Sequence, residues 1–158
     1  MDHVGRKTLP HHVPPWVDPA ESDYFITIGC ERRGTNQLCL PATASALLDS
    51  ARFYHAQRKW FPSLLLLMPD HLHMLVSFGR GSDMVKVVTA WKRYAATHHG
   101  VLWQRGFFEH RLRRDESIDE KASYILQNPV RAGLVDKPAA WPWVLMFDQD
   151  GNEIRQKE

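Results

Sequence analysis

The sequence predicts an α+β domain in which strands and helices follow the order β-α-β-β-α-β, with one further helix after them. Two observations favour this class. Short runs of β-branched, aromatic or leucine residues alternate with longer segments whose apolar residues recur at helical spacing. Proline, glycine and asparagine separate these segments. Such an order builds a ferredoxin-like fold, an antiparallel four-stranded sheet with two helices on one face and the other face open.

The first strand and the first helix are predicted between residues 23 and 60. The segment DYFITIGC, residues 23–30, is β-branched and aromatic and predicts a strand. Gly34 and the two residues after it predict a turn or loop. After Pro41 a helix is predicted to about Trp60, because apolar residues recur there at helical spacing: Ala44, Leu47, Leu48 and Ala51.

The next two strands form a hairpin. Residues 63–68 are a short apolar run that suits a buried strand, Pro69 and Asp70 turn the chain, and residues 71–78 return as the partner strand. Glycines at 79 and 81 end this strand.

A second helix, a last strand and a third helix complete the predicted order. Ser82 can cap the second helix, whose apolar stripe contains Met84, Val87, Val88, Trp91 and Ala95. Residues 101–112 are expected to form the fourth strand. The third helix begins at Asp115 or Ser117, and Pro129 is expected to end it, because proline disfavours helical geometry in the residue before it.

Composition indicates one globular domain. The chain has 158 residues, 44% of them hydrophobic and 24% charged, with a formal net charge of +2. We expect an irregular arm over residues 1–20, which hold four prolines, a folded domain over 21–145, and a polar tail over 146–158. The mild charge means that any nucleic-acid binding depends on local basic patches.

The cysteine pattern and the absence of long apolar runs favour a cytoplasmic protein that does not contact a membrane. Cys30 and Cys39 match no zinc spacing and do not form a disulfide framework, which favours a reducing compartment. The N-terminal segment lacks the apolar core of a secretory signal. The run LLLLM at residues 64–68 is too short to span a bilayer.

The most informative motif is the pair His71 and His73 within MPDHLHMLVSF. Because side chains alternate along a strand, both imidazoles point to one face, while the apolar side chains of Leu72, Met74 and Val76 point to the other. Two imidazoles on neighbouring positions of one face can share a divalent ion. The alternative is a polar stripe on an exposed sheet face.

The third helix carries Tyr124, with Asn128 one turn later on the same helical face. The apolar stripe of this helix contains Ile118, Ala122 and Ile125, and Tyr124 lies off that stripe. We therefore expect Tyr124 to serve as a nucleophile if the helix crosses the histidine face. A phenol needs activation at neutral pH, from a metal-polarised phosphate or from a neighbour such as Lys121.

A third feature is the basic and aromatic segment RGFFEHRLRR at residues 105–114. Arginines that bind phosphates and rings that stack on bases often form nucleic-acid surfaces. The alternative is an edge strand with a charged outer face. The candidate DNA-binding residues are Arg105, Phe107, Phe108, His110, Arg111, Arg113 and Arg114, extended by Lys92, Arg93 and Lys121.

Taken together, three motifs resemble a known family. The motif HLH after MPD, the motif W-x-R-G-F-F-x-H, and the segment YILQNPVRAGLV occur in the order found in single-tyrosine HUH transposases of the REP-associated branch. The resemblance covers roughly residues 20–145. It implies a metal-dependent endonuclease and strand transferase for single-stranded DNA, with a hairpin of the REP type as substrate and a 5′-phosphotyrosine intermediate.

Carried over to this chain, the resemblance makes Tyr124 the nucleophile and His71, His73 and Asn128 the ligands of Mg²⁺ or Mn²⁺. Partners would be single-stranded or hairpin DNA, with the protein either a monomer or a homodimer. Two alternatives stay open. One is a non-catalytic DNA- or RNA-binding protein on the same scaffold, and the other is a domesticated relative that only regulates its own hairpin.

Overall fold

The computed structural model describes residues 22–157, so the arm expected over residues 1–20 lies outside the described residues. Within the described part, six strands form one antiparallel sheet in the order β4-β1-β3-β2-β5-β6. The strands are β1 (Tyr24–Gly29), β2 (Phe61–Leu67), β3 (His71–Ser77), β4 (Phe108–Arg111), β5 (Val144–Phe147) and β6 (Glu153–Ile154). The first four have the ferredoxin-like order, which confirms the predicted fold class.

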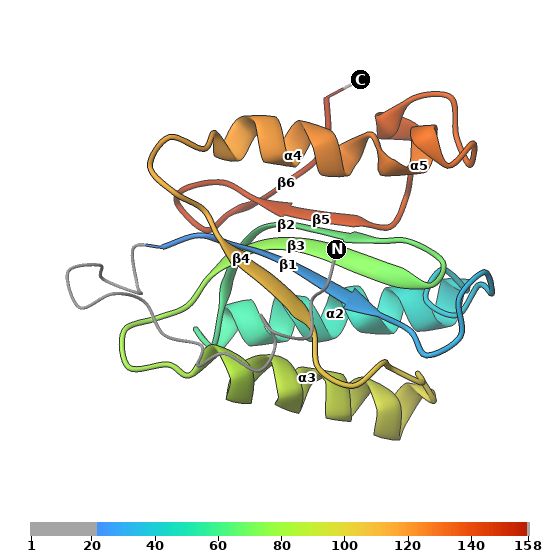
Figure 1. Cartoon of the computed structure of the whole chain (residues 1–158), viewed down its shortest axis with the longest axis horizontal. Coiled ribbons are helices and arrows are strands. Elements are labelled where there is room, and N and C mark those ends of the chain that lie inside the picture. The colour runs from blue at the N-terminus through green and yellow to red at the C-terminus, as the bar shows by residue number, and fades with distance from the viewer. Residues whose placement is uncertain (1–21, 158) are drawn as a thin grey trace.

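The helices divide between the two faces of the sheet (Figure 1). Two long helices cover one face, as the fold requires: α2 (Pro41–Ala56) and α3 (Met84–His99). On the other face lie α4 (Ile118–Leu126), the short α5 (Asn128–Arg131) and a 3-10 turn, η2 (Pro138–Ala140). The additional helix predicted to carry the tyrosine is α4.

Each face of the sheet has its own core. Under α2 and α3, even-numbered residues of β3 pack with Trp60 and Trp91, as the alternation predicts. On the opposite face, Leu64, Leu66 and Leu75 pack against Ile125 of α4. The final helix was expected to cross this second face, and α4 covers its β2 and β5 side, where β2 is apolar on both faces. The open part is confined to β3, β1 and β4.

Helix ends follow local hydrogen-bonding rules. Ser117 caps α4, since its Oγ accepts a 3.2 Å hydrogen bond from the Glu120 N–H. Asp83, rather than Ser82, caps α3 by accepting from the Lys86 N–H. The tyrosine helix α4 ends at Leu126, before Pro129 as predicted, but Pro129 does not prevent a second short helix from forming. It lies in the first turn of α5, where its missing N–H removes no intrahelical bond.

Two regions differ from the predicted elements. Strand β4 is shorter than the expected 101–112, because the chain before it forms a loop held by Lys92 of α3, whose Nζ donates to the carbonyls of Gln104 and Gly106. The boundary expected at residue 145 falls inside β5, and the following residues pair as β6. An ion pair of 2.8 Å between Arg52 and Glu153 joins β6 to α2.

In residues 22–157, the helices lack the length and apolar content needed to cross a bilayer.

Candidate active site

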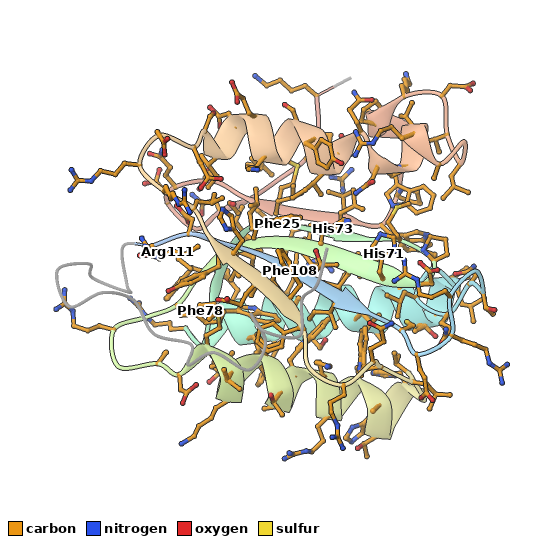
Figure 2. The ribbon with its side chains drawn as sticks, viewed as in Figure 1. Phe25, His71, His73, Phe78, Phe108 and Arg111 are labelled. Atoms are coloured by element: carbon orange, nitrogen blue, oxygen red, sulfur yellow. The ribbon has the colours of Figure 1, made fainter. Side chains whose placement is uncertain are left out.

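The two histidines lie side by side on the central strand β3 and face α4 (Figure 2). In the register with β1, His71 stands opposite Gly29 and His73 opposite Thr27. Their ring centroids are 4.9 Å apart, with the planes at 76°. The shared face predicted from the strand alternation is therefore present.

Each imidazole is held through its Nδ1 atom. His71 Nδ1 lies 2.7 Å from Asp70 Oδ1, and His73 Nδ1 lies 3.0 Å from Thr27 Oγ1. These bonds leave the Nε2 atoms for another partner, which is the usual arrangement of metal-binding histidines. Burial, and then the nearby charges of His71, Arg131 and Arg33, lower the pKa of His73 to about 3. His73 is therefore neutral at physiological pH, as a ligand must be.

Asp70 connects this pair to the loop that follows β1. Its Oδ2 accepts a 2.7 Å hydrogen bond from the Gly34 N–H and pairs with Arg33 Nε at 3.3 Å. Burial raises the pKa of this carboxyl, but the hydrogen bonds from Gly34 and His71 and the charge of Arg33 hold it below its usual range. Asp70 is thus an anionic orienting group for His71.

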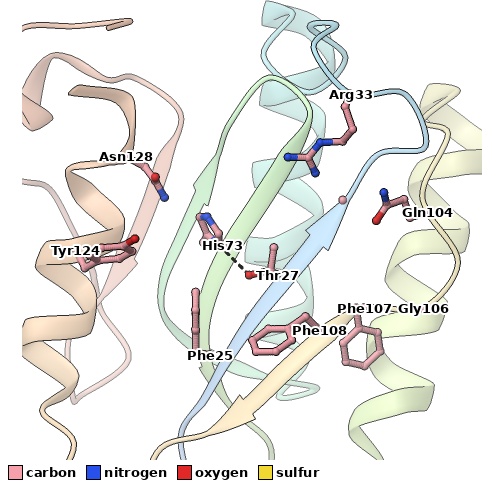
Figure 3. Close-up of a pocket in the computed structure, with 11 residues that line it drawn as sticks. Phe25, Thr27, Arg33, His73, Gln104, Gly106, Phe107, Phe108, Tyr124 and Asn128 are labelled. Carbon is pink, nitrogen blue, oxygen red and sulfur yellow. Dashed lines mark hydrogen bonds between the residues drawn. The ribbon is translucent and has the colours of Figure 1, made fainter. Parts of the chain in front are cut away.

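Tyr124 and Asn128 reach the same cavity as His73 from the opposite wall (Figure 3). The cavity has a volume of about 440 Å³ and lies over β1, beside β3 and β4. Tyr124 is 61% exposed and lines the cavity. The described residues that line the cavity are Phe25, Thr27, Gly29, Arg33, His73, Gln104, Gly106, Phe107, Phe108, Tyr124 and Asn128.

Arg131, which the sequence motifs did not single out, contacts both Tyr124 and Asn128. Its guanidinium lies 4.1 Å from the centroid of the Tyr124 ring. Its Nη2 donates to the Tyr124 carbonyl at 2.7 Å and to Asn128 Oδ1 at 3.1 Å. Arg131 is three residues after Asn128, and this spacing was the available signal.

The residues fit a divalent metal in part. The two free Nε2 atoms of His71 and His73 are suitable ligands, each with an orienting partner behind it. Asn128 fits less directly, because its oxygen accepts from Arg131 and its buried Nδ2 has no hydrogen-bond partner in the described chain. The amide oxygen of Asn128 has two lone pairs, so it can accept from Arg131 and still offer the second lone pair to a metal. Across residues 22–157, no three His, Cys, Asp or Glu side chains gather as a metal site.

Three predicted DNA-binding residues lie outside the exposed basic surface that was expected. Phe107 is 5% exposed and belongs to the core under α2 and α3, although it also lines the cavity. Lys92 is 9% exposed, and its ammonium bonds two carbonyls of the loop before β4. Arg93 lies on α3, on the opposite face of the sheet from the histidines. Arg93 therefore lies apart from the cavity and Lys92 is engaged with the loop, and a DNA contact of either residue stays a prediction.

The other predicted contacts lie near the cavity or along β4. Phe108 lines the cavity, with its ring 6.3 Å from that of Phe25. His110 and Lys121 both pair with Glu116, at 3.0 and 3.7 Å. Arg111 is half-buried, whereas three other arginines are exposed: Arg105, Arg113 and Arg114.

Comparisons with known proteins point to one family of relatives. No family model matches the chain. A Haemophilus influenzae protein, named provisionally as a REP-associated tyrosine transposase, is 26% identical over 96 residues, which cover 50% of this chain and 54% of that protein. The Escherichia coli REP-associated tyrosine transposase is 29% identical over 83 residues, which cover 49% of each chain. The chain thus spans about half the length of the curated relatives it matches, and their names confirm the resemblance found in the motifs.

Two solved structures share the fold. One is a REP-associated tyrosine transposase bound to a REP hairpin, with a TM-score of 0.66 and 22% identity, covering 86% of this chain and 82% of that chain. The other is a crystal structure of a provisionally assigned transposase from Deinococcus radiodurans, with a TM-score of 0.50 and 19% identity, covering 78% and 97%. At these identities the likeness establishes the architecture.

Proposed function

We propose that this protein is a single-stranded DNA endonuclease and strand transferase, in the manner of the REP-associated tyrosine transposases that it resembles. The observation that carries the proposal is the meeting of Tyr124 and Asn128 with His73 around one cavity. These side chains come from α4, α5 and β3, about fifty residues apart in the sequence. A polar stripe that served only solubility would not require an exposed tyrosine on the opposite wall.

The proposed step is an in-line displacement at phosphorus. The Tyr124 phenol oxygen forms a bond to the scissile phosphorus while the bond from phosphorus to the 3′ oxygen breaks. The phenol loses its proton and the leaving oxygen gains one, so the products are a 5′-phosphotyrosine link and a free 3′-hydroxyl. A 3′-hydroxyl from the same or another strand can attack the link and rejoin DNA. No nucleotide cofactor is needed, because the covalent intermediate retains a phosphodiester bond.

The chain's own residues prepare this step. Asp70 and Thr27 orient His71 and His73, and Arg131 restrains the Tyr124 ring. Mg²⁺ or Mn²⁺ held by the two Nε2 atoms, with Asn128 as a third ligand, would supply positive charge beside the scissile phosphate. Amide oxygen and imidazole are ordinary ligands for such ions.

The proposed substrate is a hairpin with a single-stranded flank. A structural relative is described as bound to a REP hairpin, and the exposed arginines at 105, 113 and 114 of this chain supply charge for phosphates along β4. The cavity of about 440 Å³ is open and has aromatic walls, so it suits an unpaired nucleotide better than a duplex.

A denaturing gel with end-labelled DNA tests the proposal. Hairpin-bearing single strands are incubated with the protein and Mn²⁺, labelled at either the 5′ or the 3′ end. A 3′ label should move to a slow protein–DNA band, because the protein joins the 5′ end of the downstream fragment. A 5′ label should mark a shorter free strand that a polymerase can extend. Tight binding with neither product would instead favour the non-catalytic hairpin-binding protein.

A further inference from the structure

Arg33 is the cavity residue that the sequence motifs do not explain. It lies in the loop between β1 and α2, and its guanidinium reaches the cavity from the side opposite Tyr124 (Figure 3). The side chain is 56% exposed. Its charge is near enough to contribute to the lowered pKa of His73. Arg33 therefore places a positive charge beside the histidine, across the cavity from the tyrosine.

Arg33 brings a full positive charge to the lining of the cavity itself. Among the described residues that line it, Arg33 is the one with a permanent charge, and none is a carboxylate. The remaining lining is mostly aromatic, amide and glycine. A cavity whose lining has a guanidinium, aromatic rings and no carboxylate fits a phosphate that carries a base.

Arg33 is held through its Nε atom, and its two Nη groups point to no hydrogen-bond acceptor among residues 22–157. The Nε atom pairs with Asp70 at 3.3 Å. The same Asp70 carboxylate holds His71 through its other oxygen at 2.7 Å. One carboxylate thus fixes a candidate metal-binding imidazole and the guanidinium beside it, and the Nη donors remain for an anion.

Gly29 on β1 has no side chain, and this leaves room for the side chains of Arg33 and Gln104. A Cβ at Gly29 would lie 2.9 Å from Gln104 Oε1 and 3.3 Å from Arg33 Nη1. Glycine at this position therefore lets both side chains lie close over the strand. The Gly29 carbonyl also accepts from the Gln104 N–H at 2.8 Å, which fixes the loop on that side.

We propose that Arg33 binds a backbone phosphate of the single strand next to the scissile phosphate, with Asp70 as its positioning residue. The inference rests on the proposed function, because it assigns a contact within the same cavity. Arg33 acts in binding and not in the displacement itself. It holds the strand across the cavity from Tyr124, so that the scissile phosphate lies between the histidines and the phenol.

Binding in the presence of EDTA tests this contact without any cleavage. Fluorescence anisotropy is measured with a labelled single strand over a range of salt, for the wild type, Arg33→Gln, Arg33→Lys and Arg32→Gln. Arg32 is an adjacent exposed arginine that does not line the cavity, so it is a control of equal charge change. Circular dichroism melting verifies that each variant is folded.

Arg33→Gln should weaken binding about tenfold, because a charge-assisted bidentate contact is lost. It should also flatten the slope of log affinity against log salt by about 0.7. Arg33→Lys should retain the slope and recover part of the affinity, and Arg32→Gln should match the wild type. Equal affinities and slopes for Arg33→Gln and Arg32→Gln would overturn the assignment. If the wild type still formed the covalent band, that outcome would leave the proposed function standing.

Discussion

Arg131 lies with its guanidinium 4.1 Å from the centroid of the Tyr124 ring and donates a 2.7 Å hydrogen bond to the Tyr124 carbonyl. The phenol is largely exposed, so this contact restrains it more than burial does. A cation over an exposed ring contributes about 0.5–1 kcal/mol, enough to favour one ring position. The nucleophile is therefore partly oriented before DNA binds.

Replacing Arg131 should slow covalent attachment more than it weakens binding. We expect Arg131→Gln to lower the single-turnover rate of adduct formation about threefold to tenfold at saturating DNA, because the ring loses its restraint. Arg131→Lys keeps the charge but loses the planar fork, and should give an intermediate rate. Quenched-flow sampling on denaturing gels measures the rate. An unchanged rate with saturated DNA would mean that Arg131 does not position the phenol.

Asn128 can be tested as a metal ligand without DNA. If its oxygen binds the metal, Asn128→Ala should weaken Mn²⁺ binding about tenfold in calorimetry, with little change in metal-free melting. If its contact with Arg131 at 3.1 Å is only structural, the variant should lose about 1 kcal/mol of stability and keep its metal affinity. The second result would leave His71 and His73 as the protein's ligands.

The hydroxyl of Thr27 should matter because it holds His73. Its Oγ1 lies 3.0 Å from His73 Nδ1, so Thr27→Val keeps the side-chain shape and removes the orienting partner. Loss of such a partner typically costs about tenfold in metal affinity. Mn²⁺ calorimetry of Thr27→Val should show this loss. A control is Thr43→Val on α2, on the other face of the sheet. Equal Mn²⁺ affinities for the two variants would exclude the orienting role.

The arginines after β4 should contribute to binding through charge alone. Replacing Arg113 and Arg114 with glutamine should weaken binding to single strands of any sequence and flatten the log–log salt slope by about 0.7 per lost phosphate contact. Lys86→Gln with Arg93→Gln removes the same charge from α3, on the far face. Filter binding across salt concentrations compares the two double variants. If both double variants show the same slope, the segment after β4 is only a solvated edge.

The sequence was sufficient for those parts of the site that follow from local periodicity. The shared face of His71 and His73 depends only on strand alternation, and the burial of Leu72 and Met74 on the other face confirms it. Tyr124 was placed off the apolar stripe of its helix, and it is exposed at the cavity.

Other features depend on tertiary contacts that no local pattern encodes. The burial of Lys92 follows from a loop that folds back on α3. Arg33 and Arg131 lie in short segments without periodicity, and their positions follow from contacts with Asp70 and with the tyrosine helix. Strands β5 and β6 were missed because four and two residues are too few to show alternation.

The most direct test of the central claim is to locate the covalent bond. Protein, hairpin-bearing single strands and Mn²⁺ are incubated, the adduct is digested with nuclease and trypsin, and mass spectrometry identifies the modified peptide. We predict a nucleotide mass on Tyr124, no adduct with Tyr124→Phe, and a normal adduct with Tyr94→Phe, a tyrosine exposed on α3. An adduct that persists in Tyr124→Phe, or a nucleotide mapped to another residue, would contradict the account.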